Sequence, residues 1–181
     1  MSRAQVGVSN VEIRDARPGD EEAIRGVTLA AYQEYAPQLL VHWDAYRRNI
    51  ESTLAERGSA EQLVAEREGR IVGAVLLYPS APFIPTREAQ PVGTRGPEVR
   101  LLAVAPGERG GGIGGALMRE CIRRARGAGA SALTLHTTDM MRVAVRLYER
   151  LGFVPAPELD FHPAPGLTVK GYRLSLAAAL S

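Results

Sequence analysis

Residues 99–115, VRLLAVAPGERGGGIGG, join an apolar run to a turn made almost entirely of arginine and glycine. The run Val99 to Val104 predicts a strand that is covered on both faces. After it, six of the seven residues from Arg109 to Gly115 are Arg or Gly. A helical pattern follows from Gly112 to Ala128, with its apolar residues on one side. The sequence therefore predicts a buried strand that leads through a glycine-rich turn into the N-terminus of a helix.

That turn predicts a binding site for a diphosphate. A helix N-terminus offers backbone N–H groups without intrahelical partners, together with the positive end of the helix dipole. Glycines have no Cβ, so an anion can come within hydrogen-bonding distance of the backbone, and Arg109 adds a cation. A turn with a purely structural role would need only one or two glycines.

Two other phosphate motifs fit the spacing less well. A nucleoside triphosphate loop needs Lys and then Ser or Thr after its last glycine, but Ala116-Leu117 stands there. A dinucleotide fingerprint should follow its strand directly, whereas residues 105–109 intervene, and the next strand lacks an acid for the ribose. The remaining pattern is Arg/Gln-x-x-Gly-x-Gly/Ala, matched by Arg109, Gly112 and Gly114.

The rest of the chain alternates strands and helices. A hairpin is predicted at the turn Glu68-Gly69. Residues 79–97 contain five prolines and two glycines, which predicts a surface loop and a candidate substrate lid. The patterns predict strands over 11–14, 62–66, 70–78, 99–104, 132–137, 153–154 and 169–176, and helices from Asp20 to Pro37 and over 43–55, 112–128 and 140–151.

These elements predict an α/β fold with a single mixed β-sheet flanked by helices. The strand, helix and strand over 99–137 should form a right-handed crossover between parallel strands. One domain is predicted over 11–176, between an N-terminal tail, 1–10, and a C-terminal tail, 177–181.

Composition excludes several classes of protein. The 181 residues carry a formal net charge of +2, which is too balanced for a nucleic-acid-binding surface. Cys121 is the only cysteine and falls in an apolar stripe, so we expect a core residue, with no disulfide and no metal site. Neither an apolar run of membrane-spanning length nor a secretory signal is present, so we expect a cytoplasmic protein without membrane contact.

A second motif lies downstream, Ala144-x-x-Leu147-Tyr148-Glu149-x-x-Gly152-Phe153. With residues 99–115, and in this order, it resembles the two signatures of the GCN5-related N-acetyltransferase (GNAT) family, and the resemblance covers 11–176. It implies a GNAT-like acyl-CoA N-acyltransferase fold, with acetyl-CoA as co-substrate. The implied activity is transfer of the acetyl group to a primary amine by direct attack. A non-catalytic acyl-CoA-binding sensor or interaction module with the same fold is the alternative.

The resemblance also implies which residues hold the cofactor. The backbone of Leu102, Ala103 and Val104 would pair with the pantetheine arm, while their side chains would belong to the core. The diphosphate would lie on the backbone N–H groups of Arg109, Gly110, Gly112, Gly114 and Gly115, in agreement with the argument from the helix N-terminus.

Tyr148 is the predicted general acid. It falls at the edge of the apolar stripe of its helix, where a phenol could protonate the departing thiolate of CoA. Helix spacing alone favours a partly buried core tyrosine. The match of Leu147-Tyr148-Glu149 to the family signature reverses that preference.

Glu98 is the candidate general base. It opens the central strand and shares a nominal face with Arg100, Leu102 and Val104, unless a bulge shifts the alternation. A carboxylate there could take the proton of the incoming amine, directly or through water, although a solvated charge is an equal alternative. His136, at the end of the next strand, ranks below Glu98 as an alternative base.

One position departs from the family pattern. Many members carry Asn three positions before the alanine of the second motif, where this chain has Met141. Thr138 or Asp139 could replace it, and Asp139 also suits the N-cap of the helix.

The amine acceptor stays open. An apolar pocket for it could form near the first two helices or at Phe161-His162, although helix packing explains these aromatic residues equally well. The aromatic residues near the first helices include Tyr32, Tyr35, Trp43 and Tyr46, with His42 among them. We expect a small-molecule or peptide amine, no nucleic acid and no membrane partner, with a homodimer left open.

Overall fold

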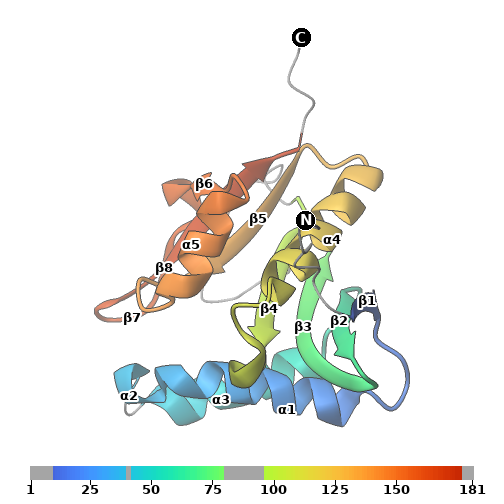
Figure 1. Ribbon diagram of the computed structural model, residues 1–181. Coiled ribbons are helices and arrows are strands. Elements are labelled where there is room, and N and C mark those ends of the chain that lie inside the picture. Colours follow the sequence, from blue (N-terminus) through green and yellow to red (C-terminus); the bar gives the residue numbers. More distant parts are fainter. Residues whose placement is uncertain (1–9, 40–41, 80–95, 177–181) are drawn as a thin grey trace, which may run out of the picture.

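The computed structural model describes residues 10–39, 42–79 and 96–176, and these form an eight-stranded mixed sheet with helices on both faces (Figure 1). The predicted fold class is confirmed. The predicted tails, apart from residue 10, and most of the candidate lid lie outside the described residues. Within the described ranges, no helix has the length and apolar character needed to cross a membrane.

The strands follow the order β1-β2-β3-β4-β5-β8-β6, with β7 paired to β8 beside this path. Their bounds are Val11–Asp15 (β1), Glu61–Arg67 (β2), Arg70–Tyr78 (β3), Glu98–Val104 (β4), Ala132–Thr137 (β5), Val154–Pro155 (β6), Phe161–Ala164 (β7) and Leu167–Ser175 (β8). The helices are Glu21–Tyr32 (α1), Ala36–Leu39 (α2), Trp43–Ala55 (α3), Ile113–Gly127 (α4) and Arg142–Arg150 (α5). Short 3₁₀ turns cover Gln33–Tyr35 (η1), Pro106–Glu108 (η3) and Pro157–Leu159 (η4).

The predicted hairpin between β2 and β3 is confirmed. Its turn residues Glu68 and Gly69 have φ values of 51° and 73°. Two left-handed residues in succession are the requirement of a tight two-residue turn between twisted strands. The hairpin joins two strands of an antiparallel run formed by β1, β2, β3 and β4.

The two central strands run parallel but separate soon after they meet. Strands β4 and β5 pair at two positions, Glu98 with Thr134 and Val99 with Leu135. Beyond Val99 the strands diverge, as Figure 1 shows. The sheet is therefore open between the far end of β4 and the rest of β5.

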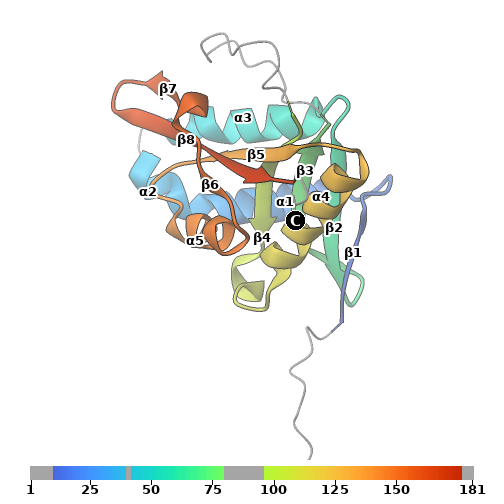
Figure 2. The same ribbon diagram turned by 90° about the horizontal axis from the view of Figure 1, so that it is seen from above.

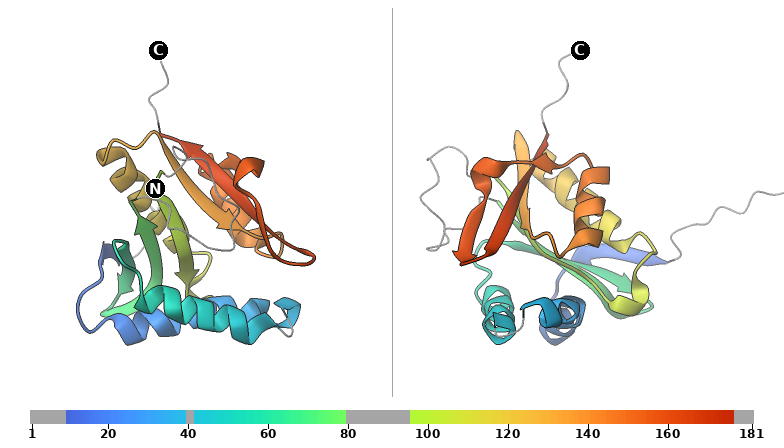
Figure 3. Two further views of the ribbon diagram at one scale, coloured as in Figure 1. Left: turned by 180° about the vertical axis from the view of Figure 1, so that it is seen from behind. Right: turned by 90° about the vertical axis from the view of Figure 1, so that its left-hand side faces the viewer.

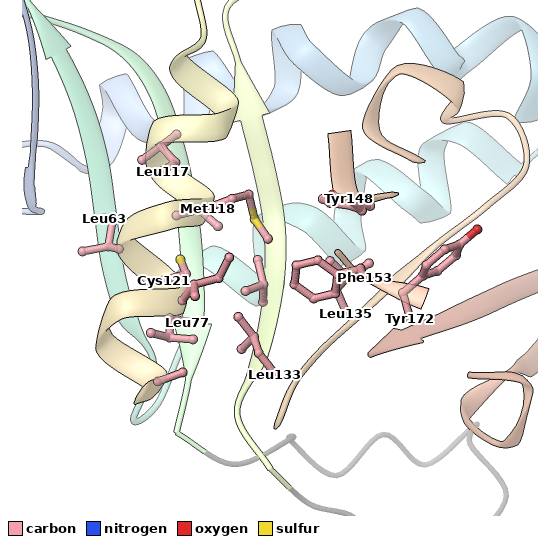
Figure 4. Close-up of a cluster of buried hydrophobic side chains, with 14 of the residues drawn as sticks. Leu63, Leu77, Leu117, Met118, Cys121, Leu133, Leu135, Tyr148, Phe153 and Tyr172 are labelled. Atoms are coloured by element: carbon pink, nitrogen blue, oxygen red, sulfur yellow. The ribbon is translucent and has the colours of Figure 1, made fainter. Parts of the chain in front are cut away.

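Helix α4 covers one face of the sheet with the main hydrophobic core (Figure 4). Its stripe, with Leu117, Met118 and Cys121, packs against the side chains of Leu63 and Leu77 from β2 and β3. Gly73 lets the helix come close, since a Cβ there would lie 3.1 Å from side-chain atoms of Ile113 and Leu117. Helix and strand thus share a tightly packed core.

Helices α1 and α3 cover the opposite face and lie side by side below the sheet in the right-hand view of Figure 3. Ile24 and Val27 of α1 pack on Val64 and Ala74 in a second, smaller core, with Leu54 of α3 beside them. The two faces of the sheet therefore have separate cores.

Most predicted helix bounds agree with the structure; Asp20 occupies the N-cap position of α1 without a side-chain cap, and the predicted N-cap at Asp139 is wrong. Asp20 precedes α1, yet its carboxylate accepts hydrogen bonds from the Arg17 backbone N–H and the Arg14 guanidinium and forms no side-chain cap. Before α5 the N-cap is Met141, while Asp139 forms an ion pair with Lys170. In both cases a nearby cation competes with the helix N–H groups for the carboxylate.

Candidate functional site

A cleft of about 330 Å³ lies where the diverging sheet meets three helices. Strand β4 runs between α5 and α4 in Figure 2, and the end of α1 completes the wall. The lining residues are Ala31, Tyr32, Glu34, Tyr35, Leu102, Val104, Glu108, Arg109, Gly110, Gly112, Ile113, Gly114, Gly115, Met141, Val143, Ala144, Leu147, Tyr148 and Arg150. The cleft therefore contains most of the predicted site residues from both sequence motifs.

The glycine turn forms one end of the cleft. Gly110 and Gly112 have φ values of 82° and 79°, in the left-handed region that glycine adopts without strain. Gly112 is the N-cap of α4 and makes no side-chain cap, and the first turn of the helix contains no acidic residue. A Cβ on Gly112 would meet nothing within 4 Å. The turn thus presents a helix N-terminus to open space, which fits an anionic group.

Gly114 has a different reason to be glycine. A Cβ there would lie 3.2 Å from Cδ2 of Leu147 and 3.6 Å from Cγ2 of Val104. The absence of a side chain lets α4 approach α5 and β4 closely. This glycine therefore serves helix packing, in addition to leaving its backbone N–H near the cleft.

Arg109 ties the glycine turn to α1 and η1. Its Nη1 donates to Oε2 of Glu34 at 2.6 Å, and its Nη2 donates to the backbone oxygen of Ala31 at 3.1 Å. Glu108, one residue earlier, forms an ion pair with Arg67 of β2. The turn is held from two sides, so its backbone donors are fixed before any ligand arrives.

A β-bulge at Leu101 controls which way β4 points its side chains. Arg100 pairs with Leu76 and Ala103 pairs with Ala74, so three steps on β4 match two on β3. Leu101 has φ 52°, in the left-handed region. The extra residue reverses the alternation, because successive side chains in a strand point to opposite faces.

The bulge sends Leu102 and Val104 into the cleft, where both are half-buried. Ala103 instead points to the face that α1 covers and is 2% exposed. Ala103 is thus buried as predicted, while Leu102 and Val104 pack against the main core as predicted and also line the cleft.

Glu98 and Arg100 point to the face opposite the cleft. Their paired residues, Tyr78 and Leu76, share the face of Ala74, which packs against α1. The nominal face shared by Glu98, Leu102 and Val104 is therefore wrong, and the bulge is the reason. Glu98 is 1% exposed and does not line the cleft.

Glu98 and His136, the two candidate bases, contact each other. Oε1 of Glu98 lies 3.1 Å from Nδ1 of His136, and Nε2 of the same ring lies 3.0 Å from the backbone oxygen of Leu159. The carbonyl can only accept, so Nε2 carries a proton. Nδ1 and the carboxylate then share one further proton, because two lone pairs would otherwise face each other. The pair joins β4, β5 and η4.

Tyr148, from α5, lines the same cleft as the glycine turn. Its side chain is 7% exposed and its ring centroid lies 6.0 Å from that of Phe153 (Figure 4). Burial raises the pKa of the Tyr148 phenol well above its usual range, and Tyr35 and Tyr46 raise it further. The side chain is therefore a neutral phenol that can donate a proton.

Cys121 does not share these properties. It is fully buried in the core under α4 and does not line the cleft. Burial raises the pKa of its thiol to about 12. A thiol that stays protonated and out of contact with the cleft is a core residue rather than a nucleophile.

Met141, which replaces the family's common Asn, lines the cleft. Just before it, the buried hydroxyls of Thr137 and Thr138 have no hydrogen-bond partner among the described residues. Buried hydroxyls usually have a partner, so these two are candidates to bond a ligand. Asp139 points away, toward Lys170.

Sequence reasoning missed how the aromatic residues and Arg100 come together. Tyr32, from the end of α1, lies in the wall of the cleft, and its ring centroid is 6.1 Å from those of Tyr35 and Tyr46. Arg100 lies over the ring of Tyr78, with Cζ 5.9 Å from the ring centroid. Tyr32 and Tyr35 stand three positions apart on consecutive helical turns, and this spacing could have predicted that their rings lie close together.

Comparisons with known proteins match this architecture. The sequence model of the Acetyltransferase (GNAT) family matches residues 28–153. Mycothiol acetyltransferase of Frankia alni is 33% identical over 162 residues, which cover 85% of this chain and 46% of that protein. The chain thus spans about half the length of the curated relatives it matches.

Solved structures agree in fold. A GNAT family acetyltransferase from Brucella melitensis, crystallised in complex with acetyl-CoA, superimposes with a TM-score of 0.60 at 25% identity, covering 95% of this chain and 92% of that one. A structure from Corynebacterium glutamicum, named histone acetyltransferase HPA2 and related acetyltransferase, gives a TM-score of 0.69 at 23% identity, covering 95% of this chain and 99% of that one.

Proposed function

This chain belongs to the Acetyltransferase (GNAT) family, and on that premise we propose that it transfers the acetyl group of acetyl-CoA to a primary amine. One observation carries the proposal. A single cleft joins a glycine-rich helix N-terminus, suited to a diphosphate, to a buried neutral phenol, suited to a leaving thiolate.

In the proposed complex, the glycine turn binds the diphosphate through the backbone N–H groups of Arg109, Gly110, Gly112, Gly114 and Gly115. The pantetheine arm then follows the exposed edge of β4 at Leu102, Ala103 and Val104, where β5 no longer pairs with it. The residues present fit the cofactor, because the turn has no side chain in the way and the two strands have separated. Bound acetyl-CoA supplies the thioester.

The reaction is a direct acyl transfer. The nitrogen lone pair of the amine attacks the thioester carbonyl, and the C–N bond forms as a tetrahedral intermediate. The C–S bond then breaks, and the thiolate takes the proton of the Tyr148 hydroxyl. Water carries the amine proton to Glu98, because this carboxylate does not line the cleft, and the proton that Glu98 shared with His136 then stays on Nδ1 of the ring. His136 holds the carboxylate in place.

The test is CoA release that depends on an amine. Calorimetry first measures binding of acetyl-CoA to the purified chain, and a thiol assay then follows CoA release over a panel of amines, with the acetylated amine identified by mass. We expect binding and amine-dependent release. Binding of acetyl-CoA without CoA release in the presence of any amine would instead indicate an acyl-CoA-binding module. The absence of binding would contradict both functions.

A further inference from the structure

Arg100 is a cation on the face of the sheet that the cofactor cleft does not use. The bulge at Leu101 turns it away from Leu102 and toward α1 and α3. Its side chain is half-buried. The cleft proposed for the cofactor and the Arg100 side chain therefore lie on opposite faces of β4, close to the opening between β4 and β5.

Arg100 forms no ion pair with a carboxylate among the described residues. Glu98, two residues earlier on the same face, is engaged with His136. Glu34, at the end of α1, is engaged with Arg109. Glu98 and Glu34 are thus engaged with other side chains, and neither forms an ion pair with Arg100.

The other neighbours of Arg100 are phenols. Tyr78 lies beneath its guanidinium, and Arg100 also acts electrostatically on Tyr32 and Tyr46. Burial raises the pKa of all three phenols, so they are neutral hydrogen-bonding groups at physiological pH. They surround the cation without cancelling its charge.

Tyr32 connects this cluster to the reacting end of the cleft. It lines the cleft and lies close enough to Tyr148 for their phenols to affect each other. An amine that reaches the thioester through the opening in the sheet would pass the cluster of Arg100, Tyr32, Tyr46 and Tyr78. Another group of the same acceptor molecule would then lie against Arg100.

We propose that Arg100 binds a carboxylate of the amine acceptor, so that the preferred substrates are amino acids or peptides whose amine and carboxylate lie on one molecule. The inference rests on the proposed acetyl transfer. A guanidinium matches a carboxylate through two parallel N–H···O bonds, and neutral phenols can donate to the same oxygens. A half-buried cation without an acidic partner favours an anionic ligand over a cationic polyamine.

The experiment compares matched pairs of acceptors, each an α-amino acid or dipeptide and its carboxamide. The measured quantity is the ratio of kcat/KM for the acid to kcat/KM for the amide. Conversion to an amide also changes the basicity of the amine, but it does so for every enzyme variant alike. The change in the ratio between wild type and variant therefore isolates the contribution of Arg100.

We expect Arg100→Met to lower this ratio by about ten- to a hundredfold, the usual effect of losing a charged hydrogen bond to a ligand. Most of the change should be in KM. Arg100→Lys keeps the charge without the planar fork and should lower the ratio less. The matched control is Arg126→Met, which removes the same charge from an exposed position near the end of α4 and should leave the ratio unchanged.

Other results overturn the inference in distinguishable ways. If amines are acetylated but the ratio is the same in wild type and Arg100→Met, the carboxylate site is wrong and acetyl transfer stands. If Arg100→Met fails to fold, as judged by acetyl-CoA calorimetry, an unchanged ratio in Arg100→Lys decides against the site. If no amine in the panel releases CoA, the proposed function fails and this inference fails with it.

Discussion

The two faces of β4 present different chemical groups. On the cleft face, the key groups are backbone N–H groups, glycines at positive φ and apolar side chains. On the opposite face they are the charged side chains of Glu98 and Arg100, beside His136 of β5 and several tyrosines. The first face suits a cofactor that every family member shares, and the second suits an acceptor that differs between members.

The largest test of this comparison is Gly112→Val on the cleft face. Valine at φ 79° costs roughly 1–2 kcal/mol in backbone strain, and its methyl groups enter the space proposed for the diphosphate. We expect acetyl-CoA to bind at least ~100-fold more weakly, since both effects act on the bound anion. Calorimetry measures the affinity.

Gly107→Val is the matched control. Gly107 lies in η3 of the same loop, has open space around its Cβ position and does not line the cleft. Its affinity for acetyl-CoA should stay close to that of the wild type. Unchanged affinity in a folded Gly112→Val protein would show that the diphosphate lies elsewhere.

The contrast between the faces also explains what the sequence could predict. Gly110 and Gly112 occur where the backbone needs positive φ, so their residue type reported the conformation directly. Leu101 takes φ 52° as well, but leucine has no preference for that region. The bulge was therefore invisible in the sequence, and the faces of Glu98 and Leu102 could not be assigned without the structure.

The contact between Glu98 and His136 was hidden for a related reason. The two residues stand 38 positions apart, and their contact depends on the parallel pairing of β4 with β5. Parallel strands and a crossover were predicted from the pattern, but the register that places Glu98 opposite Thr134 depends on side-chain packing. The elements were thus predictable, and the partnerships across them were not.

Tyr148→Phe gives the next largest expected effect and tests whether the cleft face does chemistry as well as binding. The change removes one oxygen and little volume, so acetyl-CoA affinity should be kept. We expect single-turnover transfer to fall by ~10², the lower end of the range for a lost general acid, because a thiolate already leaves readily.

Tyr172→Phe serves as the control, because Tyr172 is buried in the same core and does not line the cleft. It should transfer acetyl at the wild-type rate. An aryl thioester, which has a more acidic leaving thiol, should restore much of the rate of Tyr148→Phe. A normal rate with acetyl-CoA itself would reduce Tyr148 to a packing residue.

Glu98→Gln tests the opposite face and should have a smaller effect. Glutamine can donate an N–H to Nδ1 of neutral His136, so the buried contact survives while the carboxylate is lost. We expect the rate to fall about tenfold below the pKa of the acceptor amine, where a base is needed, and to approach the wild-type rate above it. The measurement is a pH–rate profile.

If Glu98→Gln leaves the profile unchanged, the proton goes to bulk water and the pair with His136 is structural. His136→Asn then separates the two roles. A structural pair predicts a lower free energy of unfolding with no change in the shape of the profile.

The smallest expected effect concerns the phenols, which lie on both faces. All six tyrosines have a raised pKa, mainly through burial, and Tyr46 is raised to about 12 although the Arg100 cation lowers it. An unfolded tyrosine titrates near ~10. The folded protein should therefore show less phenolate absorbance at pH 10 than the protein unfolded in guanidinium, which is half ionised there.

The same pKa shifts determine how stability changes with pH. Folded phenols hold their protons more tightly, so their contribution to the free energy of unfolding is complete below about pH 10 and is lost as the pH rises toward the folded pKa values.

Removing the Arg100 cation sharpens the comparison between the faces. In Arg100→Met, phenolate absorbance from Tyr46 and Tyr78 should appear at higher pH than in the wild type, since the cation no longer stabilises the anion. Tyr148, whose pKa shift has no contribution from Arg100, should ionise as in the wild type. A phenolate midpoint near pH 10 in the folded protein, with the fold verified by circular dichroism, would mean that water reaches these tyrosines. The cleft would then offer Tyr148 no dry environment in which to keep its proton for the thiolate.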